Sequence, residues 1–194
     1  MSDDKFARDK NKAMASLTQA LDSGDVDGKI IPILKIINSL PGYYTTSSCA
    51  GRIMVLEIPS AGEKKEARTL GKWHHKIHLQ KLKDCFHQAR RGEIWFLVQS
   101  PIFHVGVESM EKTSPLLRIA IVNGFKNSGI KTQGKKIIIE ITSTERVNTP
   151  LGMDGKVMCS DEYLKLLVQV ANHAIERSDK KIDRLNTNLF QLHI

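Results

Sequence analysis

The segment from Tyr44 to Ile53, YTTSSCAGRI, places small polar side chains directly before a glycine and an arginine. Its run of hydroxyl and thiol groups can offer several donors and acceptors to one ligand. Gly51 permits a positive φ angle or a close approach of the backbone, and Arg52 supplies a planar fork for a carboxylate or phosphate. The segment predicts a binding loop for a polar ligand; the alternative is a solvated turn with an ordinary surface arginine.

Cys49, within this segment, raises the question of a cysteine nucleophile. Such a residue needs a neighbouring base and an activated thiol, and a sequence displays neither. Free cysteines are among the residues most often packed inside proteins. The spacing from Cys49 to Arg52 is also too short for the phosphate-cradling loop of cysteine phosphatases. We therefore expect a buried, inert cysteine and keep a cysteine-dependent enzyme as the weakest alternative.

A second cluster, Trp73 to His78, contains three histidines. His74 and His78 stand four residues apart, so they would share one face of a helix and could act as metal ligands. No acidic or cysteine residue nearby completes such a set, which favours a metal-free protein whose imidazole or indole lines a groove or packs. His104 lies in an apolar segment, a setting that by itself is typical of a core histidine.

The third stretch, Asn123 to Ile130, NGFKNSGI, surrounds a cation and an aromatic ring with small turn-forming residues. In a nucleic-acid site, Lys126 would meet a phosphate and Phe125 would stack on a base. A helix end followed by a plain turn uses the same residue types. Both interpretations stay open at this point.

The elements that must position these residues alternate between helix and strand. Apolar periodicity and capping signals predict five helices and three strand regions. The helices are expected from the start to about residue 22, over 26–40 and 79–91, from 113 to about 122, and from 160 onward. The strand regions are 43–58, 94–107 bent around Pro101, and 137–141, while 60–71 reads as an exposed loop. The two halves show a weak suggestion of duplication.

Composition limits the class of protein. The 194 residues are 41% hydrophobic and 26% charged, which suits one soluble domain spanning 1–194. No apolar run is long enough for a membrane span or a signal peptide, so a cytoplasmic location is expected. Cys49, Cys85 and Cys159 include no CxxC pair, which argues against disulfides and a cysteine-built zinc site. The net charge of +8 favours polyanionic partners, above all nucleic acid.

Several common catalytic motifs are missing from the sequence. It contains no GxGxxG, GxxxxGK[ST], HExxH or GxSxG pattern. Dinucleotide-dependent, NTPase, metalloprotease and serine hydrolase activities therefore have no anchor, and neither does a Rossmann-type methyltransferase.

With YTTSSCAGRI followed at this separation by GFKNSGI, the chain resembles the tRNA wybutosine-synthesising methyltransferase family, the third enzyme of the eukaryotic pathway and its archaeal relatives. The resemblance covers nearly the whole chain. It implies N4-methylation of aminocarboxypropyl-demethylwyosine at the guanosine 3′ of the anticodon in tRNA-Phe, with S-adenosylmethionine as methyl donor and no metal. It also implies an α+β fold unlike Rossmann enzymes, in which duplicated β/α repeats share one curved, barrel-like mixed sheet. A chain without fused pathway domains is similar to the archaeal members.

From the chemistry that the resemblance implies, we assign roles to residues as a hypothesis. The proposed catalytic pair, which orients the base or accepts its proton, is His75 and His104. The residues assigned to the cofactor pocket are Ser47, Ser48, Gly51, Arg52, Lys126, Asn127 and Ser128. Some relatives carry a histidine where this sequence has Glu145, which leaves that position without an assigned role. The alternative function is a non-catalytic RNA-binding module that recognises the anticodon loop. Oligomeric state is not predicted.

Overall fold

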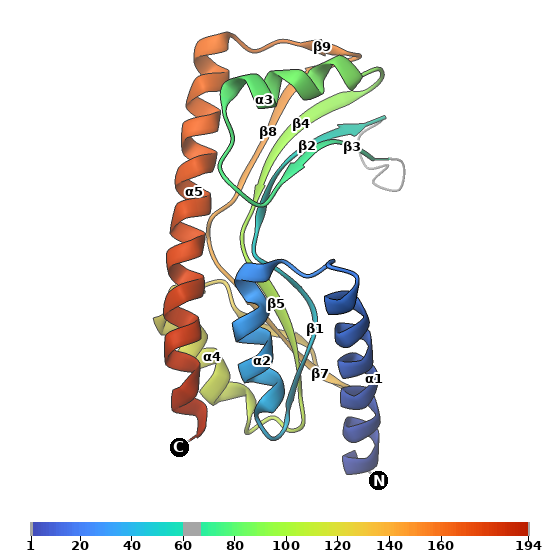
Figure 1. Cartoon of the computed structure of the whole chain (residues 1–194), viewed down its shortest axis with the longest axis vertical. Helices are drawn as coiled ribbons and strands as arrows, with labels where there is room; N and C mark the ends of the chain where they lie inside the picture. The colour runs from blue at the N-terminus through green and yellow to red at the C-terminus, as the bar shows by residue number, and fades with distance from the viewer. Residues whose placement is uncertain (1, 60–66, 194) are drawn as a thin grey trace. The chain divides into compact units, whose positions relative to one another are not determined.

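The computed structural model describes residues 2–59 and 67–193 and contains both helices and antiparallel strands (Figure 1). The chain divides into two compact units, each assembled from segments that are distant in sequence. Unit 1 comprises residues 1–50, 101–144 and 178–194, and unit 2 comprises residues 51–100 and 145–177. No helix among the described residues combines the length and apolar character needed to cross a bilayer.

Unit 1 is built on a four-stranded antiparallel sheet of order β1-β5-β7-β6. Its strands are β1 (Tyr43–Cys49), β5 (Ile102–Val107), β6 (Gly129–Thr132) and β7 (Ile137–Thr142). Its helices are α1 (Ser2–Asp22), the short 3-10 helix η1 (Gly28–Ile30), α2 (Ile31–Ser39), α4 (Thr113–Val122), the end of α5 (Asp161–Asn188) and the 3-10 helix η4 (Leu189–His193).

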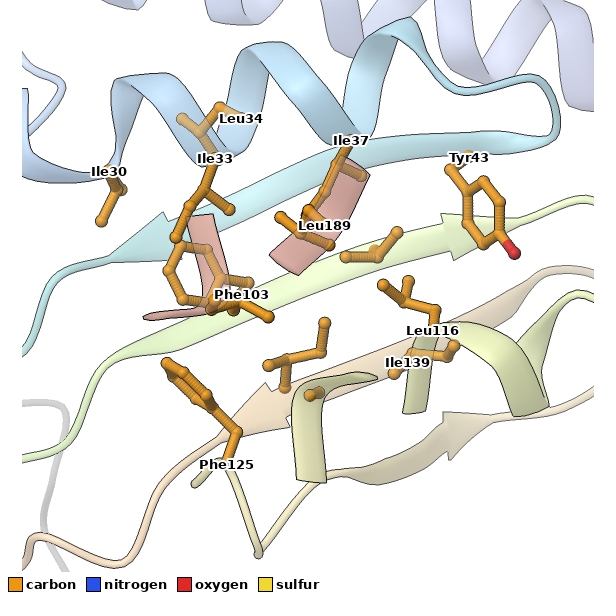
Figure 2. Packing of buried hydrophobic residues seen from close by; sticks show 14 of the residues in the cluster. Ile30, Ile33, Leu34, Ile37, Tyr43, Phe103, Leu116, Phe125, Ile139 and Leu189 are labelled. Carbon is orange, nitrogen blue, oxygen red and sulfur yellow. The ribbon is translucent and has the colours of Figure 1, made fainter. Parts of the chain in front are cut away.

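One face of this sheet carries the core of unit 1. Strand side chains alternate between the two faces, so Phe103, Val105 and Val107 of β5 all point into this core. Figure 2 shows Ile33 and Ile37 of α2 facing Phe103. Apolar side chains of β7, α4 and η4 complete the cluster. Burial of large apolar side chains is the main favourable term for folding, so packing on this face holds the helices of unit 1 against the sheet.

The opposite face of the same sheet meets α1. Phe6 of α1 packs on Tyr44 of β1 with ring centroids 5.3 Å apart. A Cβ built on Gly106 of β5 would come within 2.2 Å of the Tyr44 ring, so the absence of a side chain there lets the ring lie on the sheet. The carbonyl of Leu40 also accepts a hydrogen bond from Lys10 of α1 at 3.3 Å. Helix α1 therefore forms a partial cover over this second face.

Unit 2 is built on a five-stranded antiparallel sheet of order β3-β2-β4-β8-β9. Its strands are β2 (Arg52–Ile58), β3 (Arg68–Trp73), β4 (Glu93–Gln99), β8 (Val147–Met153) and β9 (Lys156–Val157). Its helices are α3 (Leu79–Asp84), the 3-10 helix η3 (Cys85–Gln88) and the first part of α5. The sheet is strongly curled (Figure 1), and register shifts in two strand pairs increase such curvature.

The expected mixed helix-and-strand fold, unlike a Rossmann enzyme, is confirmed. The strands differ in arrangement from the single mixed sheet that the resemblance implied: they form two sheets, and every pair is antiparallel. The chain passes from one unit to the other at Ala50–Gly51 and again at Ser100–Pro101. Gly51 has φ of +90°, and Pro101 lacks the N–H needed to continue a ladder, so both pairs suit a break between strands. The prediction of one domain over 1–194 stays a prediction.

Two local expectations were wrong. The helix expected over 79–91 ends at Asp84 and continues only as the 3-10 turn η3. The backbone N–H groups of Arg90 and Arg91 donate to the Glu57 carboxylate instead of continuing a helix. The loop expected over 60–71 includes strand β3 from Arg68, which pairs with β2, while residues 60–66 lie outside the described part of the chain.

Candidate active site

A cavity of about 670 Å³ lies in unit 1 between α1, the start of α2 and the polar half of β1. Thr46, Ser47 and Ser48 of the YTTSSC segment contribute to its wall, so this segment does line a hollow, as a binding loop should. The complete lining consists of Asp9, Lys12, Ala13, Ser16, Leu17, Ala20, Asp25, Val26, Ile30, Leu34, Tyr44, Thr46, Ser47, Ser48, Lys136 and Ile138. Its size falls in the range of small-molecule sites, roughly 300–1,000 Å³.

Ser48 differs from its neighbours in having a buried hydroxyl without a hydrogen-bond partner. A buried polar group left unpaired costs about 1–3 kcal/mol of desolvation, so such groups are rare unless something else satisfies them. Because Ser48 lines the cavity, a bound ligand could supply the missing partner.

Ser47, His104 and Glu140 form a chain of hydrogen bonds across three neighbouring strands. Ser47 Oγ lies 2.8 Å from His104 Nδ1, and His104 Nε2 lies 2.9 Å from Glu140 Oε2. Lys131 Nζ approaches the same Glu140 oxygen at 3.0 Å. Burial opposes ionisation of Glu140, but the hydrogen bonds from His104 and Lys131 outweigh it and hold the pKa of this carboxyl below its ordinary value. His104 is thus half-buried and polar-bonded, not the core histidine that its apolar neighbours suggested.

Charged groups of α1 and the sheet also reach the cavity. Asp9 bonds to Lys136 at 2.9 Å and to Lys5 at 3.0 Å. The hydrogen bonds from Lys136 and Lys5 lower the pKa of the half-buried Asp9 carboxyl, and the bond to Asp9 raises the pKa of Lys136. Lys12 has no ion pair with any residue that the structure describes. A cationic group is therefore available at the cavity wall for an anion.

The turn that contains Lys126, Asn127 and Ser128 lies in unit 1 but outside the lining of this cavity. The Ser128 hydroxyl donates to the Phe125 carbonyl at 2.6 Å and accepts from the Thr142 amide at 3.1 Å. The Asn127 amide donates to the Thr142 carbonyl at 3.2 Å, and Lys126 is exposed. These bonds fix the turn against the end of β7.

Phe125 does not stack on a base. Its side chain is fully buried and meets Phe103 edge-on with centroids 6.0 Å apart (Figure 2). The interpretation of a helix end followed by a turn is the correct one, since α4 stops at Val122 and Gly124 adopts φ of +98°. A helix C-terminus commonly buries an apolar residue just beyond it, and Phe125 fills that role here.

Gly51, Arg52 and His75 belong to unit 2. Arg52 begins β2, and its Nε donates to Gln99 Oε1 at 2.7 Å. That bond uses one edge of the guanidinium and leaves its terminal nitrogens for another acceptor. His75 Nε2 lies 3.3 Å from Lys81 Nζ, so the ring nitrogen acts as acceptor. The structure thus places Ser47, Ser48 and His104 in unit 1. Gly51, Arg52 and His75 lie in unit 2.

The histidine cluster has no helical geometry. Residues 74–78 precede α3, whose N-terminal flanking residue is His78, so His74 and His78 do not share a helix face. The segment is fixed by Asn172 of α5, whose side chain accepts from the Ile77 amide and donates to the Ile77 carbonyl, both at 2.9 Å. Among the described residues, no three histidine, cysteine or acidic side chains gather as a metal site would require.

The cysteines and Glu145 have structural settings. Cys49 is half-buried in β1, more open than the buried position expected. Cys85 is buried and donates to the Leu82 carbonyl, and burial raises the pKa of its thiol to about 12. Glu145 is buried in unit 2 with Arg177 Nε at 3.8 Å.

Sequence reasoning missed the α1 residues of the cavity and Glu140. The cavity face of α1 carries residues 9, 12, 13, 16, 17 and 20, a helical spacing that includes both polar and apolar types. The search for apolar periodicity passed over the polar members. In the sequence, Glu140 is visible only as a charged residue that interrupts the apolar run IIIEI. A carboxylate is rare in such a strand unless it has a partner, so this interruption was the one available signal.

Sequence comparisons with known proteins identify one family of methyltransferases. A family model described as Methyltransferase TYW3 matches residues 8–191. A Pyrococcus furiosus protein named tRNA(Phe) 7-((3-amino-3-carboxypropyl)-4-demethylwyosine(37)-N(4))-methyltransferase 1 is 45% identical over 191 residues, covering 98% of this chain and 97% of the relative. A Thermococcus kodakarensis protein of the same name is 43% identical over 190 residues, covering 97% of this chain and 96% of the relative.

Solved structures have the same fold. A Pyrococcus horikoshii protein superposes with a TM-score of 0.90 at 44% identity, covering 96% of both chains. An Aeropyrum pernix protein superposes with a TM-score of 0.73 at 29% identity, covering 86% of this chain and 98% of that one.

Proposed function

Because this chain belongs to the TYW3 methyltransferase family, we propose that it transfers the methyl group of S-adenosylmethionine to N4 of 7-(3-amino-3-carboxypropyl)-4-demethylwyosine in tRNA(Phe). The curated relatives that bear this activity in their names align along nearly the whole chain. The structural observation that carries the proposal is the cavity under α1, in which the Ser48 hydroxyl lacks a partner.

The residues of the cavity fit S-adenosylmethionine. The methyl donor carries a carboxylate, an ammonium group, ribose hydroxyls and an apolar adenine face, which together need both charges and apolar wall. Lys12 offers a cation for the carboxylate, and Asp25 offers a carboxylate oxygen for the ammonium or ribose. Leu17 and Leu34 supply apolar wall for the adenine.

S-adenosylmethionine supplies a methyl group on a sulfonium, which is electrophilic without help from a metal. The protein's task is then to hold donor and acceptor in line and to keep water out. Thr46, Ser47 and Ser48 lie on one strand, so the sheet holds their hydroxyls in fixed positions relative to one another. In this proposal Ser48 binds the donor, while Ser47 and His104 face the nucleoside.

The acceptor nitrogen loses a proton when it gains the methyl group. The new N–C bond forms as the S–C bond breaks, and the sulfur keeps the electron pair. The Ser47 and His104 pair, 2.8 Å apart, is the base that receives this proton. Gly51, Arg52, His75, Lys126, Asn127 and Ser128 remain predicted contacts of the cofactor or nucleoside.

The tRNA itself is a polyanion, and the net charge of +8 supports its binding. Lysines that contact phosphates release counterions, so the affinity for tRNA should fall as salt concentration rises. Cytoplasmic location follows from this proposal, because tRNA modification of this kind takes place where tRNA is used.

The test is methyl transfer to a defined tRNA. Purified protein is incubated with S-adenosylmethionine and tRNA(Phe) carrying the aminocarboxypropyl precursor, and the nucleosides are analysed by mass spectrometry. The expected result is N4-methylated nucleoside and S-adenosylhomocysteine in equal amounts. Transcript tRNA(Phe) without the tricyclic base serves as the control and should gain no methyl group.

Two outcomes would count against the proposal. Absence of product at saturating donor and tRNA would refute the activity. A protein that forms no product but binds tRNA tightly, and that gives no heat when titrated with S-adenosylmethionine, would instead support the non-catalytic RNA-binding module. The same reaction with a precursor that lacks the aminocarboxypropyl group shows which substrate is accepted.

A further inference from the structure

We propose that Glu140 is a positioning residue for methyl transfer, fixing His104 in the tautomer that takes a proton from Ser47. The inference rests on the function proposed above. Glu140 lies outside the sequence motifs and outside the cavity lining. In this proposal it acts only through its hydrogen bond with His104.

The geometry comes from the register of the sheet. His104 of β5 is paired directly with Glu140 of β7, and β1 lies on the other side of β5. Opposed residues in an antiparallel pair have their Cβ atoms about 4.5–5.5 Å apart and share one face. The contact between Glu140 and His104 is therefore set by strand pairing and not by a loop.

The hydrogen bonds select one tautomer of the imidazole. An ionised carboxylate only accepts hydrogen bonds, so His104 Nε2, 2.9 Å from Glu140 Oε2, must carry the hydrogen. In the neutral ring Nδ1 is then a lone-pair acceptor, and it faces Ser47 Oγ at 2.8 Å. Ser47 therefore donates its hydrogen to Nδ1, and the remaining lone pairs of Oγ are free for the substrate.

Lys131 compensates the charge of the carboxylate. Its ammonium group lies 3.0 Å from the same Glu140 oxygen, so the negative charge has a permanent cationic partner. With Lys131 present, Glu140 can orient the ring without needing it to be charged. The two side chains of the Glu140–His104 pair are only 19% and 24% exposed, which limits competition from water.

The proton balance of the step is complete. As the acceptor nitrogen bonds to the methyl carbon, its hydrogen passes to Ser47 Oγ, and the hydrogen of Ser47 passes to His104 Nδ1. The product ring is an imidazolium that bonds to Glu140 through Nε2. The negative carboxylate stabilises that cation, as an acid residue does for a catalytic histidine in other enzymes.

The test combines a spectroscopic signature with kinetics. The ring nitrogens of ¹⁵N-histidine-labelled protein are observed by long-range proton–nitrogen correlation, with His104→Gln used to assign the signal. Wild-type His104 should show protonated Nε2 and unprotonated Nδ1 in its neutral form. Glu140→Ala and Glu140→Gln should both lose this single-tautomer pattern. A Gln side chain keeps the volume but can either donate to or accept from the ring.

Kinetics supply the second readout. Removing an outer partner that orients a metal-ligating histidine typically costs about 10–100-fold, and we expect a loss of similar size in kcat for methyl transfer in both variants. The KM for S-adenosylmethionine should change less than about twofold, because Glu140 does not line the cavity. Lys35→Met is the control: this exposed lysine of α2 forms no ion pair with the described residues, and its loss should change neither readout.

Failure of the inference is separable from failure of the proposed function. An unchanged His104 tautomer in both Glu140 variants overturns the positioning role, whether or not the wild type is active. Unchanged kcat in variants that have lost the tautomer overturns it as well. A wild type without methyl transfer, but with the expected tautomer, refutes the proposed function alone. Glu140→Gln keeps the test valid if Glu140→Ala does not fold.

Discussion

Replacing Ser48 with alanine should have opposite effects on folding and on binding. The Ser48 hydroxyl is buried at the cavity wall and lacks a partner in the free protein. Removing it takes away an unsatisfied polar group, so the free protein should become slightly more stable. The same change removes the hydrogen bond that we propose between Ser48 and the methyl donor, so binding of S-adenosylmethionine should weaken.

The size of each effect follows from the hydrogen-bond energetics. Leaving a hydroxyl buried and unpaired costs about 1–3 kcal/mol, part of which Ser48→Ala recovers, so the melting temperature should rise by up to about 3 °C. A hydrogen bond to a neutral ribose hydroxyl contributes roughly 0.5–1.5 kcal/mol, so its loss weakens binding about 2- to 12-fold. A bond to the donor's carboxylate contributes roughly 1.5–3 kcal/mol, or about 12- to 150-fold. The measured factor therefore identifies which group Ser48 meets.

Thermal denaturation and isothermal titration with S-adenosylhomocysteine measure the two effects separately. Ser39→Ala is the matched control, because Ser39 is outside the cavity and its hydroxyl already donates to the Ile36 carbonyl at 2.7 Å. That variant should lose a little stability and keep its affinity. A Ser48→Ala protein that is clearly less stable than wild type, or that binds with unchanged affinity, would refute the reasoning.

Three further predictions concern the core, acid stability and the thiol. Phe125→Ala should lower the free energy of unfolding by about 3–5 kcal/mol in urea titrations, while tRNA affinity of the folded protein stays unchanged, since the ring packs on Phe103. Burial raises the pKa of Glu57, but hydrogen bonds from the amides of residues 90 and 91 and from Arg68 outweigh it, so the net pKa is lowered. The ionised Glu57 carboxylate stabilises the folded protein fully above the ordinary pKa of 4.5, and this stabilisation is lost as pH falls through the lower pKa of the folded state. In acid denaturation curves, Glu57→Gln should therefore lose stability less steeply over this pH range. Cys49→Ser should retain full methyl transfer, and loss of activity would revive the cysteine-dependent alternative.

Helices and the strongest strands were predictable because their signals are local. Repeating apolar positions placed the opening and closing helices, and Gly124 marked the end of α4. Strand β8 escaped because Pro150 lies within it, and proline normally argues against a paired strand. The proline is tolerated because β9 pairs with β8 only at residues 152 and 153. On the side away from β4, no described strand pairs with Pro150, so its missing amide hydrogen leaves no hydrogen bond unmade there.

The candidate site was predictable only in part. The YTTSSC segment was identified from its composition, and the cavity beside it agrees with a binding role. The pairing of His104 with Glu140 depends on strand register, which adjacent residues in the sequence do not reveal. The burial of Phe125 was hidden for the same reason, because its partner Phe103 is brought near it only by the fold.

Helix α1 covers the cavity with side chains that are only partly buried, and Leu17 packs at the edge of the core. None of its side chains from Lys5 to Asp22 is fully buried, whereas α2 buries Ile33, Leu34 and Ile37. Segments with so few buried contacts open locally at much lower cost than the whole protein unfolds, and their amide hydrogens exchange correspondingly fast. A ligand that binds only while α1 is in place slows that exchange in proportion to its occupancy. We therefore expect ligands to enter the cavity through local opening of α1, while the rest of unit 1 stays folded.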